Sequence, residues 1–161
     1  MANKTNGDVT VSKDVAAPPE VVWEMVTDLP RMGEWSPESQ GGHWRDGVEK
    51  PAVGARFTGS NRNGLFRWKT NATVVEMMPR TVFSFDVSVL GIAVSNWRYE
   101  IEPTDSGCTV TETWTDHRAR WFAAFALLAT GVGDRESHNR ETMETTLDAL
   151  AAAAEKAAPP G

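Results

Sequence analysis

The segment from Cys108 to Asp116 constrains the fold of this chain most strongly, because its residues alternate strictly between two kinds. Every second position is a threonine, and the positions between the threonines include Glu112 and Trp114. Side chains of a β-strand point alternately to opposite faces of the sheet. We therefore expect a half-buried strand here, with the threonines toward solvent and Trp114 toward the interior.

A two-residue period also runs through the segments that precede this strand. One face of each segment gathers apolar and aromatic side chains, and the opposite face carries polar ones. The inward residues predicted in this way are Phe66, Trp68, Thr70, Ala72, Val74, Phe83, Phe85, Val87, Val89, Trp97, Tyr99 and Ile101. Glycine, proline, asparagine and aspartate at turn positions separate the segments, so the chain between Pro37 and residue 116 predicts an antiparallel meander of about six strands.

Helical patterns flank this meander. A strand from Val9 to Val15 comes first, and a short helix from Pro18 to about Asp28 and a further helical turn from Leu29 to Trp35 follow it. Lys13 interrupts the apolar phase of the first strand, which indicates an edge or a bulge. After the meander, Asp134 is a favourable N-cap for a long helix that continues to about Lys156. Its narrow apolar stripe suits a helix laid across a sheet and consists of Met143, Leu147, Leu150 and Ala154.

The length and composition favour one domain with its own core. The chain has 161 residues, of which 40% are hydrophobic. We expect the domain over residues 8–156, with flexible tails at 1–7 and 157–161. The formal charge of −6 and the isoelectric point near 5.1 argue against a phosphate-binding surface, so no nucleic-acid partner is expected.

Signals for export, membrane insertion and metal binding are missing from the sequence. The N-terminus is polar, Cys108 is the single cysteine, and the apolar run from Trp121 to Ala129 is shorter than the ~20 residues of a membrane-spanning helix. We therefore expect a cytoplasmic protein without an integral membrane span. His43, His117 and His138 lack the spacing of metal ligands, and no nucleotide-binding motif occurs, so neither a metal nor another cofactor is expected.

The order of these elements and several short motifs resemble one superfamily. The motifs lie at residues 9–12, 17–23 (Ala-Pro-Pro-Glu-Val-Val-Trp), 27–37, 53–57, 96–99 and 111–114. They are similar to the START-like, or SRPBCC, superfamily and to its polyketide cyclase/dehydrase branch. The resemblance implies an α+β helix-grip fold, in which a curved antiparallel sheet of about seven strands surrounds a long C-terminal helix, and two short helices follow the first strand.

The resemblance also implies a pocket between the sheet and the C-terminal helix. We expect it to bind a small hydrophobic ligand, such as a lipid, a polyketide or an isoprenoid, for transport or conversion. The aromatase/cyclase members carry an arginine four residues after the tryptophan that resembles Trp68, whereas this sequence has Ala72 there. That departure favours a binding protein over a cyclase.

Aromatic residues dominate the candidate pocket. The chain contains seven tryptophans, and most of them fall on or beside the predicted concave face. Two interpretations stay open: these rings fill a solid core, or they line a ligand pocket. The residues predicted to line the pocket are Trp35, Trp44, Phe57, Asn61, Phe66, Trp68, Phe83, Phe85, Trp97, Tyr99, Glu112, Trp114, Met143 and Leu147. For Asn61, a role in the adjoining turn is the alternative.

Glu112 is the most informative polar residue of this set, because its phase places a carboxylate between apolar side chains. With Tyr99 it forms the candidate catalytic pair of a polyketide cyclase or dehydrase that moves protons. The alternative is a structural carboxylate paired with an arginine or a backbone amide. The sequence thus supports both a binding protein and an enzyme.

The apolar segment from Ala119 to Gly133 is unusual for a connection between a strand and a helix. Three interpretations stay open: a lid over the pocket mouth, a homodimer contact, or a surface that touches a membrane. The residues concerned are Trp121, Phe122, Phe125 and Leu128, with Gly131 and Gly133 as hinges. A protein that only docks a partner through residues 121–128 is a further functional alternative.

Overall fold

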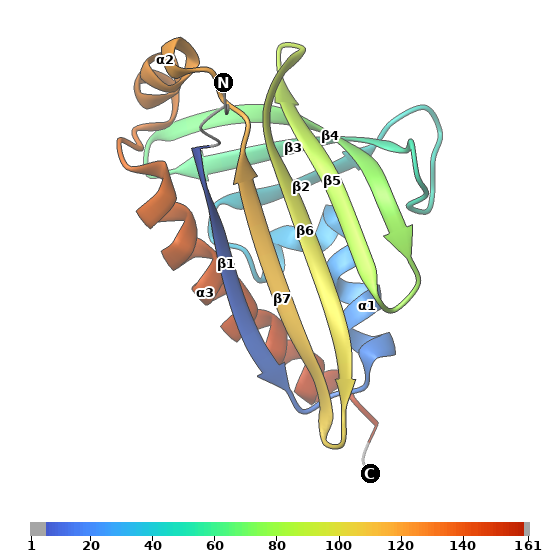
Figure 1. Ribbon diagram of the computed structural model, residues 1–161. Helices are drawn as coiled ribbons and strands as arrows, with labels where there is room; N and C mark the ends of the chain where they lie inside the picture. Colours follow the sequence, from blue (N-terminus) through green and yellow to red (C-terminus); the bar gives the residue numbers. More distant parts are fainter. Residues whose placement is uncertain (1–5, 160–161) are drawn as a thin grey trace, which may run out of the picture.

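Seven antiparallel strands form one curved sheet in the computed structural model, which describes residues 6–159 (Figure 1). The strands are β1 (Asn6–Val15), β2 (Ser39–Trp44), β3 (Arg56–Asn63), β4 (Phe66–Met78), β5 (Val82–Val89), β6 (Ile92–Thr104) and β7 (Gly107–Asp116). Their order is β1-β7-β6-β5-β4-β3-β2, so consecutive strands from β2 to β7 are neighbours and β1 lies beside β7. The predicted meander and its opening strand are confirmed.

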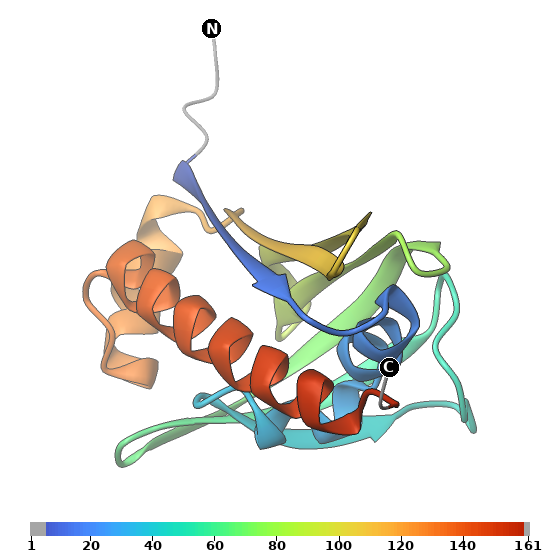
Figure 2. The ribbon, with the colours of Figure 1, turned by 90° about the horizontal axis from the view of Figure 1, so that it is seen from below.

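Four helical segments complete the fold within the described range. They are α1 (Pro19–Thr27), the 3-10 helix η1 (Leu29–Glu34), α2 (Arg120–Thr130) and α3 (Arg135–Ala157). Figure 2 shows, from below, that α3 crosses the open side of the curved sheet. The sheet and this helix enclose the interior between them, which is the α+β helix-grip architecture that the sequence predicts.

α3 begins where capping chemistry predicts. The side chain of Asp134 accepts a hydrogen bond from the backbone N–H of Ser137 at 3.1 Å, which satisfies one donor of the first helical turn. The predicted apolar stripe is at most 1% exposed and consists of Met143, Leu147, Leu150 and Ala154. The capping residue therefore identifies the start of α3, and helical periodicity identifies the face that meets the sheet.

The register of the strands lines up inward side chains in rows. Trp97 of β6 lies opposite Trp114 of β7, and Tyr99 lies opposite Glu112 in the next row. β5 continues the first row, because Phe85 pairs with Trp97. The two-residue period identifies the inward face of each strand, and the register decides which inward side chains become neighbours.

β1 is one edge of the sheet, which explains the interruption at Lys13. Nζ of Lys13 lies 2.8 Å from Oδ1 of Asp148 on α3, in a solvent-exposed ion pair. β1 begins at Asn6 and α3 ends at Ala157, so the regular structure extends slightly beyond the predicted limits of 8 and 156. Residues 1–5 and 160–161 of the predicted tails lie outside the described residues.

Candidate functional site

A cavity of about 220 Å³ lies between the concave face of the sheet, α2 and α3. Its lining comes from η1 and the segment that follows it, from strands β2 to β7, from α2 and from the first half of α3. Nine predicted pocket residues line it, namely Phe57, Asn61, Trp68, Phe85, Trp97, Tyr99, Glu112, Trp114 and Met143. The strand phases therefore bring most of the predicted set to one space.

Five predicted pocket residues lie outside this lining, namely Trp35, Trp44, Phe66, Phe83 and Leu147. Phe83 and Leu147 belong to the packed core and are at most 1% exposed. The ring of Phe83 meets Trp23 of α1 at 6.2 Å between centroids. α1 thus covers part of the concave face of the sheet, and the inward side chains beneath it belong to the packed core. The aromatic residues therefore fill a solid core in one part of the sheet and line a cavity in another.

The other three lie at the margins of the cavity. Trp35 is 5% exposed, and its indole N–H donates to Sδ of Met32 at 3.2 Å. Trp44 packs edge-on against Phe57, with ring centroids 5.3 Å apart, and so supports a lining residue without being one. Phe66 is 43% exposed at the start of β4.

Tyr99 and Glu112 form a buried polar pair in the cavity wall. The Tyr99 hydroxyl donates to Oε1 of Glu112 at 2.7 Å, so the partner of this carboxyl is a tyrosine and not the arginine or backbone amide of the alternative interpretation. Burial raises the pKa of Glu112 to about 8, although the hydrogen bond from Tyr99 acts in the opposite direction. Burial, aided by the adjacent Glu112, raises the pKa of Tyr99 well above its usual value. Both groups are therefore predominantly protonated at pH 7.

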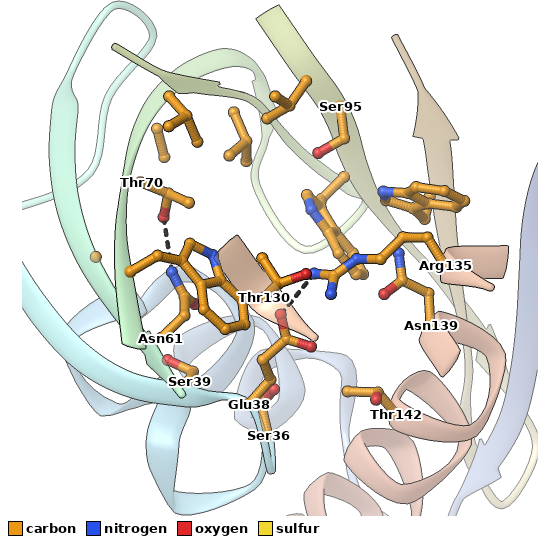
Figure 3. A pocket seen from close by; sticks show the side chains of 18 of the residues that line it. Ser36, Glu38, Ser39, Asn61, Thr70, Ser95, Thr130, Arg135, Asn139 and Thr142 are labelled. Atoms are coloured by element: carbon orange, nitrogen blue, oxygen red, sulfur yellow. Dashed lines mark hydrogen bonds and ion pairs between the residues drawn. The ribbon is translucent and has the colours of Figure 1, made fainter. Parts of the chain in front are cut away.

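A second polar group joins the segment before β2 to the first turn of α3. Nη2 of Arg135 donates to Oε1 of Glu38 at 2.5 Å, and Nε2 of His138 lies 3.0 Å from Oε2 of the same carboxylate. The guanidinium of Arg135 also lies over the ring of Trp68, 5.7 Å from its centroid. Figure 3 shows Arg135 reaching from the helix toward Glu38 across the cavity.

Glu38, Arg135 and Asn139 line the cavity but were not predicted to do so from the sequence. A signal was present on α3, because Arg135 and Asn139 precede Met143 at four-residue intervals and so share its face of the helix. Their polarity made them look like the solvated start of a helix. Glu38 lies in an irregular segment, where no periodicity indicates the direction of a side chain.

Three buried side-chain atoms have no hydrogen-bond partner among the described residues: Oε2 of Glu112, Nη1 of Arg135 and Nδ2 of Asn139. All three residues line the cavity. Leaving a buried donor or acceptor unpaired costs roughly 1–3 kcal/mol. The cavity is therefore where this fold leaves polar groups without internal partners.

Two further polar lining residues are paired within the protein. Asn61 lies in β3 and not in the adjoining turn, and its Nδ2 donates to Oγ1 of Thr70 at 3.1 Å. Nη2 of Arg118 donates to Oδ2 of Asp116 at 2.7 Å. These contacts hold both side chains in fixed positions on the wall.

The predicted lid segment contains α2, which covers part of the cavity. Phe122 and Ala126 line the cavity, whereas Trp121 and Leu128 are 66% and 78% exposed. The helix ends at Gly131, whose φ of 70° is the left-handed conformation typical of a helix C-cap. One face of α2 thus belongs to the cavity wall and the other faces outward.

The described residues contain neither a metal-binding cluster nor a membrane-spanning helix. No group of three or more His, Cys, Asp or Glu side chains among them could hold a metal ion. No helix in the same range has the length and apolarity to cross a membrane. Cys108 is buried and lies outside the lining of the cavity.

Comparisons with known proteins agree with this architecture. Residues 6–155 match the model of the family described as polyketide cyclase/dehydrase and lipid transport. Among curated proteins, no sequence matches the chain. Among solved structures, the Polyketide_cyc-like protein Cgl2372 from Corynebacterium glutamicum is 30% identical, with a TM-score of 0.52 over 92% of this chain and 85% of that one.

Other solved structures share the fold at lower identity. The di-domain ARO/CYC StfQ from the steffimycin biosynthetic pathway has a TM-score of 0.72 and 15% identity, over 92% of this chain and 51% of that one. CV1439 from Chromobacterium violaceum has a TM-score of 0.68 and 13% identity, over 92% and 97% of the two chains. At these identities the likeness shows the fold alone.

Proposed function

Because the chain belongs to the polyketide cyclase/dehydrase and lipid transport family, we propose that it binds a small, largely apolar molecule between the sheet and α3. The observation that carries this proposal is the cavity, whose wall holds Trp68, Trp97 and Trp114 together with all three unpaired polar atoms. A packed core would fill such a space and pair such atoms. Lipids, polyketides and isoprenoids are the ligand classes that suit an aromatic wall with few polar groups.

Apolar burial supplies the affinity in this proposal, at roughly 25 cal/mol per Å² of surface removed from water. The rings of Trp97 and Trp114 lie 6.5 Å apart and are inclined by 50°, so they present two differently oriented surfaces to a ligand. α2 acts as the lid, because Phe122 completes the wall from the outside. Gly131 and Gly133 are the hinges that let the helix move away from the mouth.

Two expectations from the sequence accompany this proposal. The cytoplasm is the proposed compartment, because a single cysteine suits a reducing environment. A homodimer through the outer face of α2, where Trp121 and Leu128 are exposed, is the alternative use of that helix. Light scattering distinguishes the two uses, since a lid alone leaves the protein monomeric.

Tryptophan emission tests the binding proposal. We expect at least one member of a panel of lipids, polyketides and isoprenoids to quench the emission in a saturable manner, because three indole rings line the cavity. Trp97→Phe should reduce the quenching. Trp23→Phe is the matched control, since Trp23 packs against Phe83 outside the lining. Unchanged emission across the whole panel would refute the proposal.

A second candidate function is a reaction of the cyclase or dehydrase type. The observation that favours it is the pair of Tyr99 and Glu112, in which Oε2 of the carboxyl has no hydrogen-bond partner within residues 6–159 as described. A carboxyl whose pKa is about 8 exchanges its proton readily near neutral pH, as a general acid or base must. Ala72, at the position of the family's arginine, counts against this function and favours binding alone.

Turnover separates the two candidates. If the chain is an enzyme, a poly-β-keto substrate should be converted by the wild type and not by Glu112→Gln, which retains the shape of the side chain and loses the titratable proton. The variant should still bind the substrate, and tryptophan emission measures this binding. Conversion at the same rate by both proteins would rule out Glu112 as the acid or base.

A further inference from the structure

The unpaired polar atoms specify the chemistry of the ligand more closely than the apolar walls do. We infer that the ligand is an uncharged molecule that presents a carbonyl or hydroxyl oxygen, as in a ketone, an ester or an alcohol, to Nη1 of Arg135 and Nδ2 of Asn139. This inference rests on the proposed function, because it specifies which molecules the cavity accepts. It separates neutral oxygenated ligands from carboxylates such as free fatty acids.

The two donor atoms lie on the same face of α3. Arg135 and Asn139 are four residues apart, so their side chains lie one helical turn from each other. Figure 3 shows both side chains on the side of the helix that faces the cavity. Guanidinium groups and the NH2 group of an amide only donate hydrogen bonds. The ligand atom that complements them must therefore be an acceptor.

Arg135 is held in position by groups that do not belong to the ligand. Its Nη2 donates to Glu38 at 2.5 Å, and the ring of Trp68 lies beneath the guanidinium. These two contacts fix the plane of the guanidinium and leave Nη1 unpaired. Because the donor is already in place, a ligand oxygen does not have to order it on binding.

The charges of the cavity wall are balanced. The acidic and basic residues among the described lining are Glu38, Glu112, Arg118 and Arg135. Arg135 is paired with Glu38, and Arg118 is paired with Asp116. The raised pKa of Glu112 keeps that carboxyl mostly uncharged at pH 7. A charged ligand would bring an uncompensated charge into this wall, which is unfavourable in a buried site.

Glu112 offers a second polar contact to the same ligand. Because Oε1 accepts the hydrogen bond from Tyr99, the proton of the neutral carboxyl is carried by Oε2. Oε2 is then a donor without a partner. A ligand with two separate oxygen atoms would pair all three unpaired atoms of the wall.

Three naphthalenes of similar size test the inference. They are 2-acetylnaphthalene, which is neutral and has an acceptor, 2-ethylnaphthalene, which has none, and 2-naphthoate, which is an anion. Calorimetric titration of the wild type should give an affinity for 2-acetylnaphthalene about tenfold higher than for 2-ethylnaphthalene, because its oxygen pairs buried donors. We expect 2-naphthoate to bind most weakly. Apolar burial alone would give the reverse order for the first two.

Two variants locate the recognition on α3. Asn139→Leu removes the amide, and Arg135→Lys keeps a positive charge beside Glu38 but loses the guanidinium fork. Each should remove most of the preference for the acetyl compound. Glu141→Gln, at an exposed position of the same helix, should keep the preference. Thermal unfolding checks that each variant is folded, and the order of affinities in the wild type decides the question even if one is not.

The outcomes separate this inference from the proposed function. If the wild type binds 2-ethylnaphthalene as tightly as 2-acetylnaphthalene or more tightly, the inference is overturned and the proposed function stands. If 2-naphthoate binds most tightly, the ligand class is an anion and the inference is also overturned. If none of the three compounds binds, the inference is overturned, and the proposed function is then decided by the panel of lipids, polyketides and isoprenoids.

Discussion

Glu112→Gln should be about 5 kcal/mol more stable than the wild type at pH 9 and nearly equal to it at pH 4. The folded wild type loses the Glu112 proton near pH 8, whereas an exposed glutamic acid loses it near 4.5. Between these values the folded state binds more protons than the unfolded state, so the free energy of unfolding falls as the pH rises. Each pH unit of the gap is worth about 1.4 kcal/mol. Below pH 4.5 both states hold the proton, and the penalty disappears.

Denaturant unfolding of both proteins at pH 4, 6 and 9 measures this effect. The glutamine side chain does not titrate and its oxygen still accepts from Tyr99, so the difference between the two proteins isolates the buried carboxyl. Glu102→Gln, at an exposed position of β6, controls for the loss of one carboxylate. A difference between wild type and Glu112→Gln that is the same at pH 4 and pH 9 would contradict the account of this residue.

Ser95→Phe should lower the affinity for any cavity ligand by at least about 100-fold, because the new ring and the ligand would compete for the same space. Ser95 is 7% exposed, lines the cavity and lies opposite Val87 in the sheet. Figure 3 shows its side chain directed into the cavity. The cavity has room for added atoms, so the folded state should not lose stability as it would in a packed core. Titration followed by tryptophan emission measures the affinity.

Thr115→Phe is the matched control for Ser95→Phe. Thr115 lies on the outward face of β7, next to the inward Trp114, and does not line the cavity. The same ring added there should leave the affinity unchanged. If both variants bind like the wild type, the ligand does not occupy the cavity.

The fold could be predicted from the sequence because the alternation of apolar and polar residues along each strand indicates which face is buried. The alternation from Cys108 to Asp116 identified Glu112 and Trp114 as inward, and the structure places both in the cavity wall. Their inward phase named Glu112 and Tyr99 as a candidate pair, but it did not predict the hydrogen bond between them. This bond depends on the register between β6 and β7, which a single strand's pattern does not specify.

The alternation predicted which face of the sheet lines the cavity, but it did not predict how far the cavity extends along the strands. Phe83 and Phe85 have the same phase on β5, yet only Phe85 lines the cavity, because α1 covers Phe83 through Trp23. Periodicity reports that a side chain is buried, and it does not report what buries it. Leu147 on α3 was assigned to the pocket for the same reason and lies in the packed core.

The polar lining residues Glu38, Arg135 and Asn139 were the largest omission. Arg135 and Asn139 share the face of Met143, but their place in the first turns of a helix suggested a solvated position. The contact that holds Arg135 in the cavity wall comes from the segment that carries Glu38, and no periodic pattern predicts the position of that segment. Tertiary contacts between irregular segments therefore determine the part of the site that sets ligand chemistry.

Native mass spectrometry of the wild type and of Ser95→Phe, each incubated with the same panel of lipids, polyketides and isoprenoids, decides whether a ligand occupies the cavity. We expect a one-to-one complex with a neutral small molecule on the wild type and the bare mass of the chain for Ser95→Phe. A bare wild-type mass, or an equal amount of complex on both proteins, would contradict a ligand site in the cavity between the sheet and α3.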